Sequence, residues 1–184
     1  EWIQLPGRHN IANVLAACAI ATAASLALPA IQTAIEEFTG IPHRLEFIRN
    51  VNGADWYNDS IATAPERTLA AIEAFEGPLV LLLGGRDKNL PWDDLARLIH
   101  QRVRAVVLFG EAASLIEKAL GTVKKGETLQ VISQCNTLEE AVQEAAKLAQ
   151  PGDTVLLSPG CTSFDAFKDF EERGEYFRKL VNAL

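Results

Sequence analysis

The sequence predicts an α/β fold: a doubly wound, mostly parallel sheet of about six strands with an N-terminal β-hairpin, preceded by an Ala-rich helix pair from a neighbouring domain. Residues 79–84 and 105–110 are continuous apolar runs, which are typical of strands covered on both faces in a parallel sheet. Strand-like and helical segments alternate from residue 65 onward, as in right-handed β-α repeats. The pair Asn52-Gly53 is a strong hairpin signal.

The first helical segment covers residues 8–28 and is almost entirely apolar, with Ala at nearly every other position. So little polar surface indicates burial on several sides. Pro29 can open a second helix over residues 29–38 at its first turn, and Gly40 ends it. Two such helices are too small to form a core, so we expect them to pack on another part of a protein.

After Gly40 the pattern changes, which places a domain boundary near residues 39–42. A hairpin is expected from strands at 43–51 and 54–58, and Pro65 begins a helix over residues 65–77. The remaining strands are expected at 79–84, 105–110, 129–133 and 154–159, and the remaining helices at about 91–102, 111–120, 137–149 and 163–182.

Composition and charge exclude several classes of protein. Lys and Arg number 17 against 24 Asp and Glu, and no basic stripe is present, so nucleic acid is not expected as a partner. No apolar run approaches the roughly 20 residues that span a bilayer, and the first residues lack the features of a secretory signal. We therefore expect a cytoplasmic protein without a membrane partner.

Cysteine and methionine counts carry two further expectations. The three cysteines are far apart in the sequence, a spacing that fits neither a disulfide framework nor a zinc motif, so we expect small buried thiols. The sequence has no methionine, and this favours an excerpt from a longer chain.

Ligands of such sheets bind at the carboxyl ends of the strands. Gly84-Gly85 can bring backbone N–H groups near a ligand and let Lys88 project toward it, while Ser163 is expected to open the last helix and offer a hydroxyl beside helix N–H groups. Neither the dinucleotide fingerprint nor the phosphate-binding loop is present. The residues themselves predict a small-anion site. They also permit a purely structural reading, in which the glycines turn the chain, Ser163 caps a helix and Lys88 is solvated.

Four ordered segments resemble the Mur ligase family: residues 7–17 (GRHNIANVLAA), 42–46 (PHRLE), 58–60 (NDS) and 157–174. The last segment is similar to the branch of the family that adds D-glutamate. The resemblance implies a three-domain protein, in which residues 1–40 are the C-terminal helices of the central ATP-binding domain and residues 41–184 are the C-terminal, dinucleotide-binding-like domain.

The resemblance also implies a reaction that is part of peptidoglycan synthesis. ATP, with Mg²⁺, phosphorylates the carboxylate of UDP-N-acetylmuramoyl-L-alanine, and the amine of D-glutamate attacks the acyl phosphate to form an amide. This segment would bind the incoming amino acid and help close over ATP. We expect it to be monomeric, to be inactive alone and to bind no cofactor by itself.

Site residues follow from the resemblance position by position, and none of them is assigned a catalytic or metal-binding role. The D-glutamate-binding residues are expected to be Thr63, Lys88, Ser163 and Phe170. The ATP-binding residues are expected to be Asn10, Asn13, Arg44 and Asp59. Asn10 and Asn13 can equally serve the helix backbone.

One segment departs from the family pattern, and several alternatives stay open. Residues 58–64 read NDSIATA, so Ile61 and Ala64 replace the usual lysine and asparagine. The alternatives are a sibling Mur ligase, a folylpolyglutamate synthase, or a non-catalytic module that binds a small anion. His43 is expected to be a structural hydrogen-bonding residue, and the run 171–173 (EER) is expected to be a solvated helix face.

Overall fold

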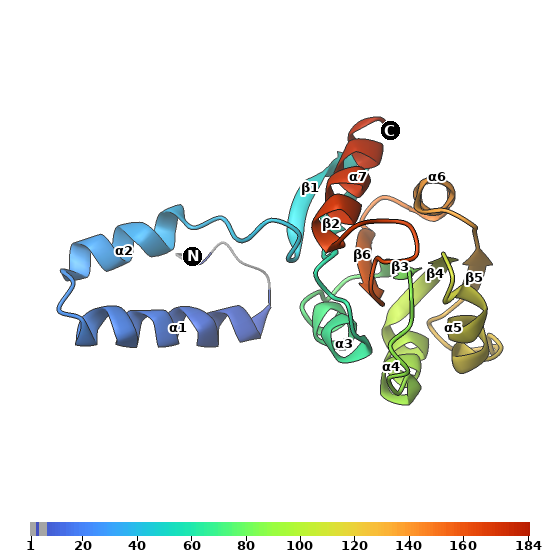
Figure 1. The fold of residues 1–184 in the computed structure, drawn as a ribbon, viewed down its shortest axis with the longest axis horizontal. Coiled ribbons are helices and arrows are strands. Elements are labelled where there is room, and N and C mark those ends of the chain that lie inside the picture. Colours follow the sequence, from blue (N-terminus) through green and yellow to red (C-terminus); the bar gives the residue numbers. More distant parts are fainter. Residues whose placement is uncertain (1–2, 4–6) are drawn as a thin grey trace. The chain divides into compact units, whose positions relative to one another are not determined.

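A computed structural model describes residue 3 and residues 7–184, which divide into two compact units, Glu1–Ile41 and Pro42–Leu184. The first unit contains α1 (Arg8–Ala23) and α2 (Leu28–Glu37), which contact each other (Figure 1). The helix expected over residues 8–28 ends earlier, because the chain turns at Ser25, which has a φ of 62°. Pro29 lies in the first turn of α2, as expected.

Among the described residues of the first unit, the apolar side chains of the two helices are largely exposed. Ile11, Leu15 and Ile20 of α1 are 48%, 64% and 71% exposed, and none of the residues of α2 is buried. That these two helices pack on another part of a longer protein stays a prediction.

The second unit is built on a six-stranded sheet in the order β1-β2-β6-β3-β4-β5 (Figure 1). The strands are β1 (Glu46–Val51), β2 (Ala54–Asn58), β3 (Leu79–Gly84), β4 (Val103–Phe109), β5 (Val131–Gln134) and β6 (Thr154–Gly160). The hairpin pair of β1 and β2 is antiparallel, and all the other neighbours are parallel. The predicted fold class is confirmed.

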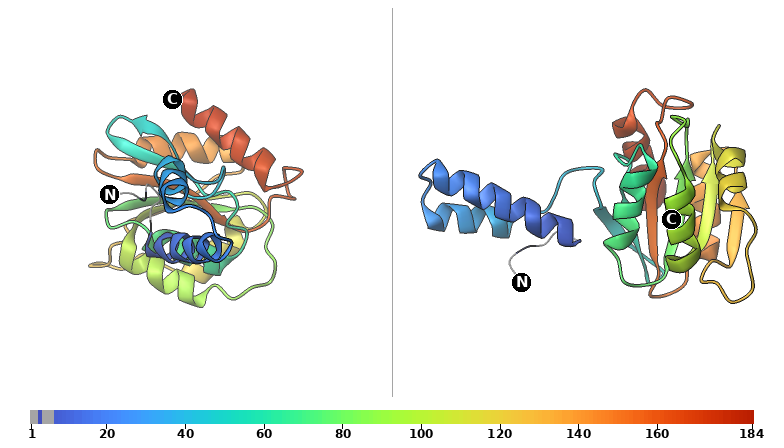
Figure 2. Two further views of the ribbon diagram at one scale, coloured as in Figure 1. Left: turned by 90° about the vertical axis from the view of Figure 1, so that its left-hand side faces the viewer. Right: turned by 90° about the horizontal axis from the view of Figure 1, so that it is seen from below.

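Five helices cover the two faces of this sheet: α3 (Pro65–Glu73), α4 (Asp93–Arg102), α5 (Ala113–Leu120), α6 (Leu138–Leu148) and α7 (Phe170–Asn182). Because side chains alternate along a strand, Leu81 and Leu83 of β3 enter the core with α3, α4 and α5, whereas Val80 and Leu82 enter the core with α6 and α7. Figure 2 shows these two helical layers. Each such buried side chain contributes about 1.5–3 kcal/mol.

Strand β1 and helix α7 both begin later than predicted, the first because of local backbone geometry and the second because of a long-range pairing. Strand β1 begins at Glu46 and not at residue 43, because His43 and Leu45 have left-handed φ values of 64° and 44°. Helix α7 begins at Phe170 and not at residue 163, because β6 runs to Gly160 and Thr162 then pairs with Arg86 in an antiparallel bridge. The last expected helix is therefore shorter at its start.

The adjacent strands β3 and β6 form the topological switch point of the sheet. After β3 the chain leads to α4 on one face, and after β6 it leads to α7 on the opposite face. In open α/β sheets, ligands bind outside the carboxyl ends of strands at such a point. The loops after β3 and β6 are therefore the first place to look for a site.

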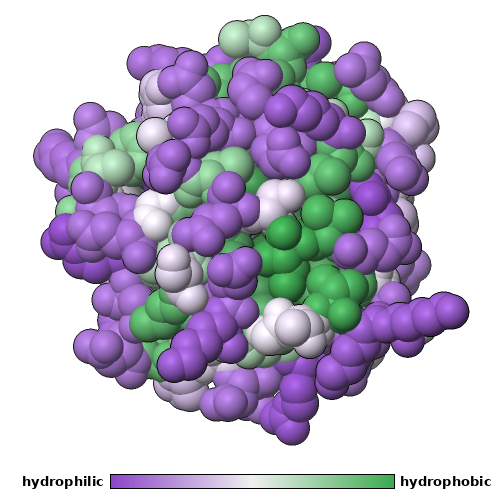
Figure 3. All heavy atoms as spheres, turned by 90° about the vertical axis from the view of Figure 1, so that its right-hand side faces the viewer, coloured by the Kyte–Doolittle hydropathy of each residue, from purple (hydrophilic) through white to green (hydrophobic). Residues whose placement is uncertain are grey.

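The sheet ends at β5, beside α5. Figure 3 views the protein from this side and shows an apolar patch bordered by hydrophilic side chains. Leu115 of α5 is 44% exposed, and Val131 and Ile132 of β5 are partly exposed. Within the described part of the chain, no helix is both long enough and apolar enough to span a membrane.

Candidate functional site

Lys88 and Thr63 meet at the carboxyl edge of the sheet. Thr63 follows β2, Lys88 follows β3, and β6 lies between these two strands. The Lys88 ammonium Nζ donates to the Thr63 hydroxyl Oγ1 over 3.1 Å. Lys88 is exposed and Thr63 is half-buried, so both groups can reach a ligand. An ammonium and a hydroxyl at this separation can bind one carboxylate together.

The loop that carries Lys88 needs its glycines. Gly84 and Gly85 have φ values of 153° and 122°, which side chains of L residues rarely adopt. A Cβ atom at Gly84 would lie 1.9 Å from the Phe109 carbonyl oxygen, and one at Gly85 would lie 2.1 Å from the Thr162 carbonyl oxygen. The loop therefore runs tightly between the ends of its two neighbouring strands.

Asp87 closes the second half of this loop. Its Oδ2 accepts from the Asn89 backbone N–H at 2.7 Å, and its Oδ1 accepts from the Trp92 indole N–H at 3.2 Å. Lys88 thus lies between two anchored residues, and its backbone direction is fixed before any ligand binds.

Ser163 does not lie at a helix N-terminus, and that part of the expectation is wrong. Its carbonyl accepts from the N–H groups of Ala166 and Phe167 in a separate turn, and Ser163 itself is buried. The cap of α7 is Asp169, whose Oδ1 accepts from the Glu172 N–H at 2.8 Å. The first turn of α7 is acidic as well, so this terminus does not favour an anion. Ser163 still lies in the loop after β6, next to the loop of Lys88.

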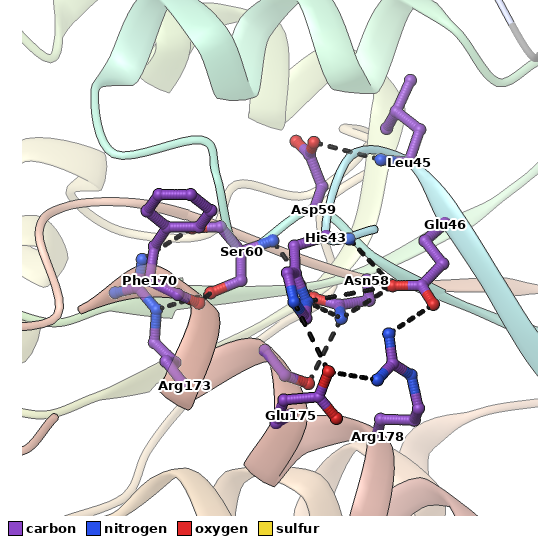
Figure 4. Close-up of polar contacts among 11 residues, drawn as sticks. His43, Leu45, Glu46, Asn58, Asp59, Ser60, Phe170, Arg173, Glu175 and Arg178 are labelled. Carbon is purple, nitrogen blue, oxygen red and sulfur yellow. Dashed lines mark hydrogen bonds and ion pairs between the residues drawn. The ribbon is translucent and has the colours of Figure 1, made fainter. Parts of the chain in front are cut away.

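Phe170 lies beside the loop after β2. Its carbonyl accepts from the Ser60 hydroxyl at 2.8 Å, and its ring meets the His43 ring edge-to-face with centroids 6.3 Å apart (Figure 4). Phe170 therefore borders the loop after β2, which also carries Thr63.

Asp59 is a buried carboxylate, 4% exposed, at the end of β2. Its Oδ1 accepts from the Leu45 N–H at 3.2 Å, and its Oδ2 accepts from the Ser158 hydroxyl at 2.8 Å. Burial raises the pKa of Asp59 from 3.8 to about 7. These two hydrogen bonds and the positive charges of Arg44 and Arg67 act in the opposite direction. The exposed Arg44 therefore interacts electrostatically with Asp59, and both residues were predicted to bind ATP.

His43 belongs to a hydrogen-bonded cluster that links β1, β2 and α7 (Figure 4). The Asn58 amide nitrogen lies 3.0 Å from His43 Nδ1 and also donates to Glu46 and to the Gly174 carbonyl, each at 3.2 Å. The His43 Nε2 atom lies 3.6 Å from a carboxylate oxygen of Glu175. The backbone N–H of His43 donates to the Glu46 carboxylate at 2.8 Å. Arg178 donates to the other oxygen of Glu46 at 2.6 Å. These contacts give His43 the structural role that was expected.

Asn10 and Asn13 belong to the first unit. The Asn13 side-chain amide donates to the Asn10 carbonyl Oδ1 over 3.3 Å, so these two side chains, one helical turn apart, face the same way on α1.

Arg173 was expected on a solvated helix face, and this is wrong, because the side chain is fully buried. It donates to the Ser60 hydroxyl at 3.0 Å, to the Ser60 carbonyl at 2.9 Å and to the Cys161 carbonyl at 3.2 Å (Figure 4 shows the Ser60 side). Burial lowers the pKa of Arg173 to about 10. The missed signal was spacing: Arg173, Phe177 and Val181 recur every four residues on the buried face of α7.

Two further features of the described residues lie apart from this site or add nothing to it. In the part of the chain that the structure describes, no group of three or more His, Cys, Asp or Glu side chains is arranged to hold a metal ion. A groove of ≈ 800 Å³ runs along α4 and the end of α5 and contains none of the predicted site residues. Within it, His100 bonds to Glu127 at 2.6 Å and to the Leu120 carbonyl at 2.8 Å, which ties the 121–127 loop to α4.

Sequence relatives of this chain are ligases. The UDP-N-acetylmuramoylalanine–D-glutamate ligase of Symbiobacterium thermophilum is 46% identical over 184 residues, which are 100% of this chain and 40% of that protein. The protein of the same name from Acetivibrio thermocellus is 43% identical, over 99% of this chain and 40% of that protein. The chain thus spans about two fifths of the length of these curated relatives.

Solved structures of more distant proteins share the fold. The UDP-N-acetylmuramate-alanine ligase of Thermotoga maritima has a TM-score of 0.69 at 17% identity, covering 98% of this chain and 39% of that one. The folylpolyglutamate synthase of the same organism has a TM-score of 0.65 at 18% identity, and the match covers 98% of this chain and 40% of that chain. The model of the family described as "Mur ligase, glutamate ligase domain" matches residues 43–161, which is more than half of the chain. This chain therefore belongs to the Mur ligase family.

Proposed function

We propose that the chain is part of an ATP-dependent ligase that adds D-glutamate to UDP-N-acetylmuramoyl-L-alanine in peptidoglycan synthesis. In this proposal residues 42–184 bind the incoming amino acid, and α1 and α2 belong to the central ATP-binding domain. The observation that carries the proposal is the contact of 3.1 Å between Lys88 Nζ and Thr63 Oγ1 at the switch point of the sheet. The names of the two curated relatives described above supply the amino acid.

The role of the amino-acid site follows from charge. D-glutamate carries two carboxylates and one amine, and Lys88 with Thr63 offers a cation and a hydroxyl for one carboxylate. Holding that carboxylate leaves the amine free to be directed at the acyl group of the other substrate. Phe170, beside Ser60, would limit the room available to the amino acid. Ser163 would act from the loop after β6 and not from a helix terminus.

On the nucleotide side, Asp59 and Arg44 can take part in binding ATP, together with Asn10 and Asn13 of the first unit. The exposed guanidinium of Arg44 suits a phosphate. The Asp59 carboxylate is 4% exposed, and in this proposal it acts on the ATP side through its charge beside Arg44. ATP with Mg²⁺ would activate the carboxylate of the acceptor substrate. No residue of this chain is proposed as a metal ligand. The whole ligase is proposed to be a cytoplasmic monomer, and the isolated chain to be inactive.

The test uses the full-length protein and measures phosphate release with D-glutamate, L-glutamate or L-alanine as the added amino acid. We expect turnover only with D-glutamate. Lys88→Ala should raise the KM for D-glutamate on the order of a hundredfold, because a charged contact to the substrate is lost, with a much smaller change in the KM for ATP. Lys147→Ala, which removes an exposed lysine from α6, is the matched control.

Two results would contradict the proposal. Equal turnover with L-glutamate or L-alanine would favour a sibling ligase, and an unchanged KM for D-glutamate in Lys88→Ala would remove Lys88 from the site. Replacing Ile61 by lysine tests the departure from the family pattern: a lower KM for D-glutamate is expected, since the variant restores a second cation near the substrate.

A further inference from the structure

Arg86 and Glu111 form a bidentate ion pair on the rim that carries Lys88. The guanidinium atoms Nε and Nη2 of Arg86 each lie 2.9 Å from one carboxylate oxygen of Glu111. Arg86 precedes Lys88 by two residues in the loop after β3, and Glu111 follows β4. The pair therefore joins the loop of Lys88 to the loop of the next strand.

The backbone of Arg86 is fixed from the other side. Its N–H donates to the Thr162 carbonyl at 2.9 Å, and its carbonyl accepts from the Thr162 N–H at 3.0 Å and from the Thr162 hydroxyl at 2.9 Å. The Glu111 N–H in turn donates to Asp165 at 3.4 Å. Arg86 thus links the loops after β3, β4 and β6 through one residue.

An exposed ion pair usually contributes little, because two flexible side chains must be ordered. Arg86 and Glu111 are 50% and 55% exposed, but their geometry differs from the usual case in two ways. The pair is bidentate, which makes it directional. In addition, the backbone of Arg86 is already held by Thr162, so less conformational freedom is lost when the pair forms. The hydrogen bonds from Arg86 also lower the pKa of Glu111, which keeps the carboxylate ionised.

We propose that Arg86 and Glu111 are positioning residues for Lys88: their ion pair sets the direction in which the loop leaves Gly85, and so holds the Lys88 ammonium at Thr63. Asp87 completes the constraint by closing the turn on the far side of Lys88. This inference rests on the proposed function, in which Lys88 pairs with a carboxylate of the incoming amino acid.

The kinetic test uses the full-length protein with Arg86→Gln, Glu111→Gln, Arg86→Lys and the double exchange Arg86→Glu with Glu111→Arg. Each Gln variant should raise the KM for D-glutamate about tenfold, because a misplaced ammonium binds the carboxylate poorly. The KM for ATP should stay within about twofold of the parent. Arg86→Lys should recover only part of the loss, since an ammonium cannot form a bidentate pair. The double exchange restores the ion pair and should return the KM to within about threefold of the parent.

Arg97→Gln is the matched control, because Arg97 forms an exposed ion pair with Asp94 on α4, with 73% and 76% of the side chains exposed. Its KM values should equal those of the parent. The inference is overturned if the Gln variants leave the KM for D-glutamate unchanged, or if the double exchange is no better than the single variants.

Amide hydrogen exchange separates this inference from the proposed function, since it needs no substrate. Exchange at residues 85–89 should be faster in Arg86→Gln and return to the parent rate in the double exchange. Unchanged exchange in Arg86→Gln would overturn the inference even if D-glutamate is confirmed as substrate. Phosphate release by the parent that does not depend on D-glutamate would refute the proposed function. If amide exchange at residues 85–89 is nevertheless faster in Arg86→Gln, the ion pair still positions its loop.

Discussion

Replacing the buried Asp59 with asparagine should make the protein more stable at neutral and alkaline pH. The side chain is 4% exposed, and its two oxygens face the Leu45 N–H and the Ser158 hydroxyl. Asparagine has the same shape without the charge. Its carbonyl can accept from Leu45, and its amide can donate to the Ser158 hydroxyl, which can turn its proton toward Thr68 Oγ1, 3.2 Å away.

The size of the effect follows from the pKa of Asp59, which burial raises from 3.8 to about 7. Between these values the folded state binds more protons than the unfolded state, so the stability of the parent falls as the pH rises. This loss of unfolding free energy, the penalty for ionising a buried carboxylate, is absent below about pH 4 and complete above about pH 7. At about 1.36 kcal/mol for each pH unit in this window, it amounts to at most about 4 kcal/mol. Asp59→Asn removes this penalty, so we expect a gain of roughly 2–4 kcal/mol at pH 8 and little change at pH 4.

Urea denaturation of parent and variant at about pH 4 and about pH 8 measures both free energies of unfolding. Asp94→Asn, which changes an exposed carboxylate on α4, serves as the control and should give the same stability as the parent at both pH values. A difference between Asp59→Asn and the parent that does not change with pH would refute the reasoning. If Asp59 serves the ATP side as proposed, the same variant of the full-length protein should raise the KM for ATP, so that stability and binding change in opposite directions.

Three further changes test individual contacts. Gly174→Ala would normally stabilise a helix, but a Cβ there would lie 2.2 Å from His43 Nδ1, so we expect a loss of about 1–3 kcal/mol in urea denaturation, and any gain would contradict the contact. Asp153→Asn breaks the ion pair between Asp153, which is 2% exposed, and Arg104, which is 13% exposed. This should cost roughly 3–5 kcal/mol of unfolding free energy. A loss below about 1 kcal/mol would show that the pair is solvated. Cys161 is fully buried, and burial raises the pKa of its thiol to about 12. Iodoacetamide at about pH 8 should therefore not modify Cys161 before denaturant is added. Labelling of Cys161 in the native protein would show that its loop opens.

The fold was largely predictable because its strands carry an unambiguous pattern. Residues 79–84 read LVLLLG, and all six are buried between two helical layers, as a continuous apolar run indicates. A different pattern, the four-residue spacing of Arg173, Phe177 and Val181, places Arg173 on the buried face of α7. It was missed because two exposed glutamates precede it and the run was interpreted by charge alone.

The details of the site were predictable only as far as they depend on strand ends. Sheet topology brings the loops of Thr63 and Lys88 to one edge, and they meet there. The start of α7 was not predictable from composition, because it depends on the bridge between Arg86 and Thr162, residues 76 positions apart in the sequence, which keeps the chain extended past Cys161. Long-range pairing of this kind leaves no local signal at Ser163.

Three loops of the rim are joined by a guanidinium that contacts mostly main-chain oxygens. Apart from the Ser60 hydroxyl, the acceptors of Arg173 are the carbonyls of Ser60, Gly84 and Cys161, groups that every amino acid possesses. Mutations that alter the outward-facing side chains of these loops would therefore leave this tie intact. The outer surface of the rim can thus vary in sequence while the frame beneath it, held by Arg173, stays the same.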